Sequence, residues 1–372
     1  MIYFDSTATT KPKQEYLDLY VRISNEYWFN TLALYSDSVK ANLLFDKASE
    51  VIKKSFNCPK DTVYFTSGAT ESNNMAIYGI CNKYLDNPKH IITSYLEHAS
   101  VLNVFKDLEK KGFKVTYLVP DKEGRINPSD LEKALTPDTI LVSLMWVNNI
   151  VGTIQPIKEV INILKNHRAK LHVDAVQGVG KIKSDFDFSD IDMFTVSGHK
   201  LHGVKGTGCL VAKSNIDLSF MKGGHQQGSF RPGTVDLPGA TVLAKCISDS
   251  IKNQEYEYSK TSELYKHLIN GLDGVQGIII NNSPSYYSPF ILSVTFIYKK
   301  AETVLHILEQ SNIYIGVGSS CNSHSKEEEP TLTYMLENSA YTKNTIRISL
   351  SSSNTIEEVD LLINKIKEIG NK

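Results

Sequence analysis

The sequence predicts an α/β protein whose core is a mostly parallel sheet covered by helices on both faces. Through the first two-thirds of the chain, short apolar runs rich in β-branched residues alternate with longer stretches of helical periodicity. The apolar runs barely alternate with polar residues, which is typical of strands buried on both faces. At 372 residues the chain can form one large domain and a smaller one, each with its own core.

The larger domain accounts for most of the predicted strands. In chain order, strands are expected at residues 62–66, 89–93, 115–119, 140–145, 170–174, 193–196 and 208–213. Helices are expected from about residue 70 and at 101–110, in each case after a strand and a polar turn. In such a sheet the ligand lies beyond the carboxyl ends of the strands, so polar residues at those ends are the candidates for a site.

The smaller domain is expected to follow a glycine-rich loop at 223–239 and a long helical stretch from about 240 to 272, which bridges the two domains. Its predicted elements are strands at 278–280 and 291–296 and helices at 302–310 and from 356 onward. We assign residues 13–250 to the large domain, and residues 1–12 and 251–372 to a small α/β domain that includes the polar loop around Cys321.

Composition narrows the functional classes. The net charge of -1, from 40 basic and 41 acidic side chains, gives no field that recruits nucleic acid or a membrane surface. The first residues show no secretory pattern, and no apolar run approaches the roughly 20 residues that cross a bilayer. The five cysteines are odd in number and form no close pairs, which indicates free thiols rather than disulfides or a zinc site. We expect a cytoplasmic protein without a metal, a membrane or a direct nucleic-acid partner.

Two charged residues stand at the ends of predicted strands. In a cleft, Lys200 would lose water, become nucleophilic and suit a Schiff base with an aldehyde; on the surface it would simply extend to solvent. Asp174 closes an apolar strand and therefore needs a partner. That partner could be the protonated ring nitrogen of a cofactor, or the amides of a helix that Asp174 caps.

Three further features allow both a functional and a structural interpretation. The turn at 66–73 could cradle a phosphate at a helix start or form an N-terminal capping box. His98 could stack on a cofactor ring and shuttle protons, or be a structural histidine. Arg347, inside an apolar run, could hold a substrate carboxylate bidentately or pair with an internal acid.

Cys321 differs from the other four cysteines. Those lie in or beside apolar segments and are expected in the core, whereas Cys321 lies in a polar loop. An exposed thiol there indicates either a reactivity that is used or a tolerated surface cysteine.

Together and in this order, these segments resemble the cysteine desulfurases, which have the aspartate-aminotransferase-like fold of pyridoxal-phosphate enzymes. The resemblance runs nearly end to end, with its strongest stretches at 65–74, 97–98, 147–149, 172–181 and 197–200. It implies pyridoxal 5'-phosphate as cofactor, L-cysteine as substrate, L-alanine as product and a homodimer. It also implies a sulfur-acceptor protein, such as an iron–sulfur scaffold for cluster assembly or a thiolation enzyme.

The resemblance assigns a role to each site residue. Lys200 would bind the cofactor covalently and move protons, and Cys321 would take the sulfur as a persulfide, with His98 a candidate acceptor for its proton. Asn149 and Arg347 would hold the substrate carboxylate. The implied cofactor contacts are His98 stacked on the ring, Asp174 at the ring nitrogen, Gln177 at the ring hydroxyl, Ala69, Thr70, Ser197 and His199 at the phosphate, and Thr234 at the phosphate of the neighbouring subunit.

Departures from the family pattern and rival interpretations remain. Ile150 replaces a usual Glu, Pro232 a common Ser and Ser351 a common Gly, and none of these removes a catalytic group. An aminotransferase or a selenocysteine lyase would share Lys200 and Asp174, and an inactive sulfur-transfer scaffold would retain them without turnover. A hydrolase that binds a metal through His172, Asp174 and His199 would have no use for Lys200.

Overall fold

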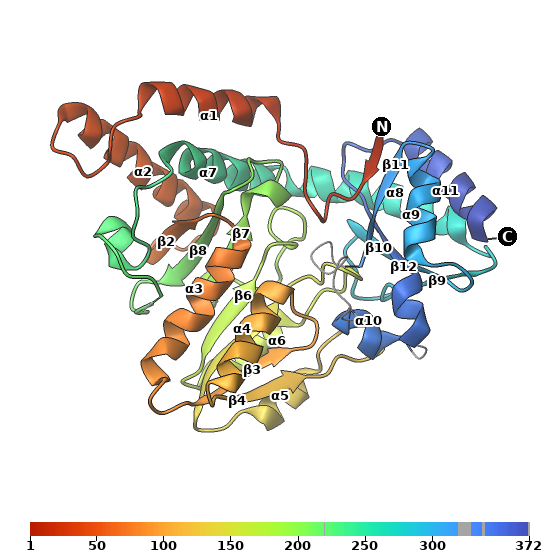
Figure 1. Ribbon diagram of the computed structural model, residues 1–372, viewed down its shortest axis with the longest axis horizontal. Helices are drawn as coiled ribbons and strands as arrows, with labels where there is room; N and C mark the ends of the chain where they lie inside the picture. The colour runs from red at the N-terminus through yellow and green to blue at the C-terminus, as the bar shows by residue number, and fades with distance from the viewer. Residues whose placement is uncertain (219, 319–328, 337–338, 371–372) are drawn as a thin grey trace.

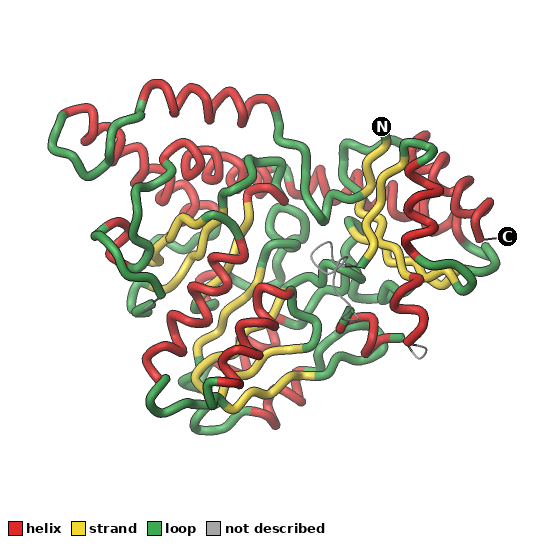
Figure 2. The backbone as a smooth tube through the Cα atoms, in the orientation of Figure 1, coloured by secondary structure: helices red, strands yellow, loops and turns green. Residues whose placement is uncertain are grey.

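The computed structural model describes residues 1–218, 220–318, 329–336 and 339–370. Two sheets lie side by side, each with its own helices, and both chain termini lie beside the second sheet (Figure 1). Figure 2 shows helices packed against the strands of each sheet. Predicted Cys321 lies outside the described residues.

The larger sheet has seven strands in the order β2-β8-β7-β6-β5-β3-β4. Neighbouring strands pair in parallel except at β8, which runs antiparallel to both β2 and β7. Every residue of β3, β5 and β7 is buried, which confirms the prediction of strands covered on both faces. The strands are β2 (Asp61–Thr66), β3 (His90–Ser94), β4 (Lys114–Leu118), β5 (Thr139–Met145), β6 (Lys170–Asp174), β7 (Met193–Ser197) and β8 (Gly208–Lys213).

Helices cover both faces of this sheet. On one face α3 (Ala69–Cys81) and α4 (Ala99–Lys110) form an apolar cluster with the strands. On the other face the cluster includes α2 (Ser36–Ser55), α6 (Ile157–Leu164) and α7 (Leu237–Lys252). Helix α6 shows the reason: its buried residues Ile157, Val160 and Leu164 recur at helical spacing. Helices α1 (Gln14–Glu26) and α5 (Pro128–Ala134) complete this part of the chain.

The second sheet has five strands in the order β1-β11-β12-β10-β9. Strand β1 (Ile2–Phe4) pairs in parallel with β11 (Ile313–Val317), so the first residues of the chain join the second sheet. The domain boundaries themselves stay a prediction. The remaining elements are β9 (Ile278–Ile280), β10 (Ile291–Phe296), β12 (Thr345–Ser349), α8 (Gln254–Leu272), α9 (Ala301–Glu309), α10 (Pro330–Met335) and α11 (Ile356–Gly370).

The long helical stretch expected at about 240–272 is confirmed, but it contains a break. The chain forms two helices there, α7 and α8, which are separated at Asn253. Asn253 leaves the helical region, with φ -94° and ψ 3°, while its amide still bonds to the carbonyl of Asp249. Helix α7 also begins earlier than expected, because the Asp236 side chain accepts the Gly239 amide and caps it.

Four cysteines are buried, as expected for core thiols: Cys58, Cys81, Cys209 and Cys246. In the part of the chain that the structure describes, no helix is both long and apolar enough to span a bilayer.

Candidate active site

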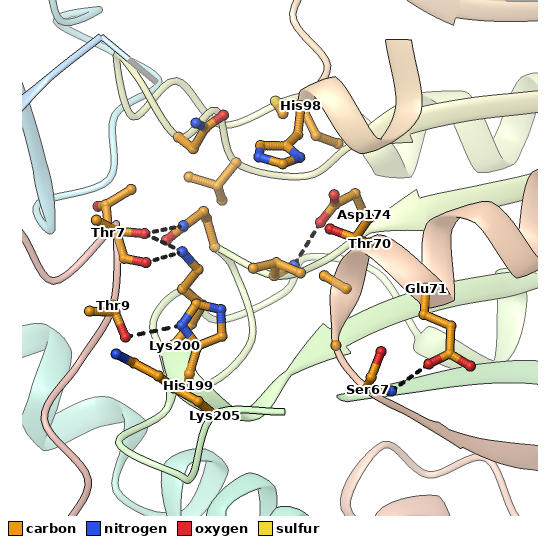
Figure 3. A pocket seen from close by; sticks show the side chains of 18 of the residues that line it. Thr7, Thr9, Ser67, Thr70, Glu71, His98, Asp174, His199, Lys200 and Lys205 are labelled. Atoms are coloured by element: carbon orange, nitrogen blue, oxygen red, sulfur yellow. Dashed lines mark hydrogen bonds between the residues drawn. The ribbon is translucent and has the colours of Figure 1, made fainter. Parts of the chain in front are cut away.

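A cavity of about 530 Å³ lies at the carboxyl ends of the large-sheet strands, with Thr7 and Thr9 of the N-terminal segment on one side (Figure 3). Arg347 of β12 also lines it. Most predicted site residues line it together: Ala69, Thr70, His98, Asn149, Asp174, Gln177, His199, Lys200 and Arg347. Two others do not. Ser197 is buried beside Gly198, and Thr234 is exposed outside the cavity.

Lys200 follows β7 through the short helical turn Gly198–Lys200. Its Nζ donates to the carbonyl oxygens of Thr7 at 2.6 Å and Ala8 at 2.7 Å. The amine therefore lies in the cavity against the N-terminal segment (Figure 3), and not at the end of a side chain extended to bulk water.

Asp174 ends β6 and is only 7% exposed. Its Oδ1 accepts the Val176 amide at 3.1 Å and its Oδ2 accepts Nδ2 of Asn73 at 2.9 Å. Within the described residues it forms no ion pair, and no α-helix starts at this point for it to cap. A buried carboxylate held by neutral donors beside a cavity suits a cationic group such as a protonated pyridine nitrogen.

The start of α3 offers a place for an anion. Gly68 has φ 151°, a conformation that favours glycine, and it places the amides of the first helical turn at the cavity. The alternative capping interpretation also holds, because Glu71 Oε2 accepts the Ser67 amide at 2.7 Å. The Ser197 hydroxyl is buried with no partner among the described residues. An anion that reached this end would find amides and hydroxyl groups to bind.

Two histidines beside the cavity are neutral near pH 7. Burial, with repulsion from Lys200 second, lowers the pKa of His199 to about 4. Its Nδ1 lies 3.1 Å from Oγ1 of Thr9. Burial also lowers the pKa of His98, although the Asp174 carboxylate opposes this. His98 caps α4, and its Nδ1 accepts the Ser100 amide at 3.1 Å.

Arg347 lines the cavity from β12 and is 2% exposed. Its Nη2 forms an ion pair with Asp5 Oδ1 at 2.7 Å, and its Nη1 donates to the carbonyl oxygens of Asn149 at 3.1 Å and Gly318 at 3.3 Å. Thus the internal acid is present, and the guanidinium also faces the cavity. Its Nε is buried with no partner in the described part of the chain.

The sequence did not predict that Asp5, Asn73 and Lys181 contact site residues. Asp5 pairs with Arg347, Asn73 bonds to Asp174, and Lys181 bonds to Gln177. Gln177 donates to the Thr7 carbonyl at 3.2 Å, and Lys181 Nζ donates to Gln177 Oε1 at 2.8 Å. Burial and then repulsion from Lys200 lower the pKa of Lys181 to about 7. All three lay within stretches that the resemblance used, but a lone Asp, Asn or Lys carries no signal for its partner.

The departure at Ile150 has a structural explanation. Ile150 and Val151 are buried against Leu332 and Met335 of α10. Next to them, Asn148 Nδ2 lies 3.3 Å from Thr331 Oγ1. An apolar residue at position 150 therefore fixes α10 against the loop that carries Asn149. Nothing in the structure explains Ser351 as a replacement for Gly.

Comparisons with known proteins agree with this site. The model of the aminotransferase class-V family matches residues 2–362. A NifS/IcsS protein homologue from Lactobacillus delbrueckii subsp. bulgaricus is 39% identical over 99% of this chain and 97% of its own. The cysteine desulfurase IscS of Methanosarcina thermophila is 35% identical over 100% of this chain and 92% of its own. A solved NifS-like protein superposes with a TM-score of 0.91 at 33% identity, covering 99% and 98% of the two chains.

The chain therefore belongs to the class-V aminotransferases and, within them, to the cysteine desulfurase family of enzymes. Members of this family depend on pyridoxal phosphate, and the residues around the cavity fit that group. The buried carboxylate of Asp174 would suit its ring nitrogen, the amides at the start of α3 would suit its phosphate, and the amine of Lys200 would suit its aldehyde.

Proposed function

We propose that this protein is a pyridoxal-phosphate-dependent cysteine desulfurase that converts L-cysteine to L-alanine and takes the sulfur on Cys321. The observation that supports it most is that one cavity holds both a lysine amine and a buried carboxylate that has no cationic partner among the described residues. In the balanced reaction, L-cysteine and the Cys321 thiol give L-alanine and a Cys321 persulfide. The substrate Cβ–S bond breaks and an S–S bond forms.

When bound, pyridoxal phosphate supplies an electron sink that weakens the bonds at the substrate's α- and β-carbons. The chain's residues would do the rest. Lys200 would remove and return the α-proton, since its amine already lies at the cavity with its hydrogen bonds on carbonyl oxygens. Arg347 and Asn149 would orient the substrate through its carboxylate. Asp174 would keep the ring nitrogen protonated, Gln177 would bond the ring hydroxyl, and Ala69, Thr70, Ser197 and His199 would hold the phosphate.

We further propose a homodimer in which Thr234 serves the partner's cavity. Two features support it. Thr234 is exposed and does not line the cavity of its own chain. Large apolar side chains also stand exposed between α1 and the start of α2, including Trp28 at 72%, Leu34 at 97% and Tyr35 at 65%. A second copy would cover such a patch, so we expect Leu34→Asp to lower the sedimentation coefficient of the protein to that of a monomer.

The cellular setting is also part of the proposal. Free buried thiols and a reactive Cys321 suit the reducing cytoplasm. The persulfide would pass to an acceptor protein, either an iron–sulfur scaffold or a thiolation enzyme. An aminotransferase or a selenocysteine lyase with the same cavity is the alternative that substrate tests separate.

The deciding experiment gives L-cysteine to the purified holoenzyme and measures alanine and protein-bound persulfide. Wild type should form both, and Cys321→Ser should form neither while it keeps its bound cofactor. Cys58→Ser is the matched control, because Cys58 is a buried core thiol for which no role in the reaction is predicted. Equal activity of wild type and Cys321→Ser would reject Cys321 as the acceptor, and faster turnover of selenocysteine than cysteine would favour the lyase.

A further inference from the structure

A buried chain of hydrogen bonds joins the two side chains proposed to face the cofactor ring. Asn73, on α3, is 0% exposed, and its Nδ2 lies 2.9 Å from Asp174 Oδ2 and 2.9 Å from Ser100 Oγ. Ser100 Oγ in turn lies 2.8 Å from His98 Nδ1. We propose that Asn73 and Ser100 are positioning residues that hold His98 neutral with its hydrogen on Nε2, so that His98 acts at the cavity as a hydrogen-bond donor.

The direction of each bond follows from the chemistry of the partners. A carboxylate only accepts, so the Asn73 amide must turn its nitrogen and not its oxygen toward Asp174. The second hydrogen on the same nitrogen then goes to Ser100 Oγ. Because the oxygen of Ser100 is an acceptor in that bond, its own hydrogen is available for His98 Nδ1.

The Asn73 carbonyl oxygen supports this orientation. It is buried with no hydrogen-bond partner among the residues that the structure describes. Turning the amide over would satisfy nothing new in that position and would place its oxygen against the Asp174 carboxylate. In this orientation the Asn73 Oδ1 has no partner among the described residues, whereas the Asn73 Nδ2 donates two hydrogen bonds.

His98 Nδ1 then receives two donors, the hydroxyl and the backbone amide of Ser100, the latter at 3.1 Å. The backbone amide can only donate, so Nδ1 carries no hydrogen, and the neutral ring has its hydrogen on Nε2. Protonation of Nδ1 would break both bonds. Burial, which lowers the pKa of His98, acts in the same sense.

Other charged groups around His98 do not change this conclusion. The Asp174 carboxylate favours the protonated ring, whereas Lys200 and Arg347 oppose it. The Asp174 carboxylate also accepts hydrogen bonds from the Asn73 side-chain amide and the Val176 backbone amide, which weakens its effect on His98. A donor role competes with the predicted role of His98 as the acceptor of the Cys321 proton, because the same nitrogen cannot be protonated and accept a proton.

The test uses the absorption spectrum of the resting holoenzyme, with pyridoxal phosphate bound and no substrate, from pH 5 to 9. In wild type we expect any step from His98 to lie below the range of an ordinary histidine, because burial lowers its pKa. In Asn73→Leu, the step should move up toward the range of an ordinary histidine, about pH 6–7, because Ser100 Oγ loses the donor that fixes its orientation and can turn to accept a hydrogen from a protonated Nδ1. Ser100→Ala, which keeps the backbone amide, should show a smaller shift. In both variants the step should vanish when His98→Gln is added.

Asn74→Leu is the matched control. Asn74 is the next residue of α3, but it is only half-buried, and it donates to the backbone carbonyls of Thr70 at 2.8 Å and Ser100 at 3.4 Å rather than to the Ser100 hydroxyl. It should titrate as wild type does. The inference is overturned if folded Asn73→Leu and Ser100→Ala both titrate like wild type, or if the shifted step survives His98→Gln. Since Ser100→Ala removes a single hydroxyl, it decides the matter even if Asn73→Leu does not fold.

This inference rests on the proposed function, since it needs the cofactor ring beside His98. The two fail separately. Wild-type cofactor binding and persulfide formation test the proposed function, and the titrations of the variants test the roles of Asn73 and Ser100.

Discussion

The two sides of the cavity treat their buried charges differently. On the side of the seven-stranded sheet, Asp174 is held by neutral donors and Lys200 by carbonyl oxygens. On the side of the five-stranded sheet, Arg347 is already paired with Asp5 at 2.7 Å. Among the described residues, the Asp174 carboxylate on the first side therefore has no ion-pair partner, whereas the Arg347 charge on the second side is neutralised by Asp5.

This difference matches what each side is proposed to bind. A cofactor stays through many turnovers, so an unpaired buried carboxylate that gains its cation from the cofactor strengthens retention. A substrate must leave as product in every cycle, and an arginine with an internal partner binds a carboxylate less tightly than a bare one. If the enzyme bound the substrate and the transition state equally tightly, KM would fall but kcat would not rise.

The largest expected effect is on the cofactor side. Lys200→Ala removes the amine that moves the α-proton, and alanine formation should fall by about 10⁴-fold. Asp174 and the start of α3 remain, so the cofactor should still bind, but should be lost on dialysis. Lys213→Ala, at the far end of β8, is the control that should retain full activity. Activity of Lys200→Ala within tenfold of wild type would contradict the assignment.

The second prediction addresses the substrate side. Arg347→Lys keeps the charge and a partner for Asp5 but loses the planar fork that binds a carboxylate with two bonds. KM for L-cysteine should rise by about 10- to 100-fold with a smaller change in kcat. Arg125→Lys is a suitable control, because Arg125 stacks on Tyr286 outside the cavity. A large fall in kcat at unchanged KM would show that Arg347 acts on the chemical step.

The third prediction removes the feature that distinguishes the two sides. In Asp5→Asn the amide can still accept from Arg347 but carries no charge, so the guanidinium should attract an anionic substrate more strongly. KM should fall by about threefold, while the free energy of unfolding should fall by about 1–2 kcal/mol, because a charge-assisted bond is weakened. Steady-state kinetics and urea unfolding on one preparation measure both. If KM rises instead, the main effect of Asp5 is to orient the Arg347 guanidinium and not to neutralise its charge.

The cofactor side was also the easier one to predict from sequence. Lys200 and Asp174 follow strands that are apolar throughout, so their positions at a sheet edge follow from local pattern alone. Asp5 and Arg347 are 342 positions apart in the chain, and they are brought together by the pairing of β1 with β11, of β11 with β12 and of Asp5 with Ser349. Asn73 was visible as a polar residue in a helix start, but its partners Ser100 and Asp174 come from other elements.

Element ends were less predictable than element types. No proline or glycine marks the break between α7 and α8 at Asn253. The residues on both sides of it have a helical pattern, so the sequence reads as continuous helix there. What breaks the helix is the conformation of one residue, at ψ 3°. Cys321 was predicted from its polar surroundings, and its role stays a prediction because it lies outside the described residues.

The last prediction concerns stability in acid rather than activity, and it involves His172, two residues before Asp174 on β6. It is fully buried between Ser143 Oγ at 2.8 Å and Thr195 Oγ1 at 3.1 Å, and burial lowers its pKa to about 3. The unfolded chain takes up a proton below about pH 6.5 while the folded chain stays neutral, so stability is lost as pH falls through that window, by about 1.4 kcal/mol per pH unit.

His172→Gln should therefore remove about 2 kcal/mol of the loss in unfolding free energy between pH 7 and pH 5, as measured by urea unfolding. His306→Gln, at an exposed histidine on α9, should leave the pH dependence unchanged. A neutral His172 also bears on the comparison of the two sides, because a proton there would place a cation close to Asp174 and offset the charge reserved for the cofactor. If His172→Gln kept the wild-type pH dependence, the acid sensitivity would have to come from other groups. That result would contradict the conclusion that His172, near Asp174, stays neutral in the folded protein.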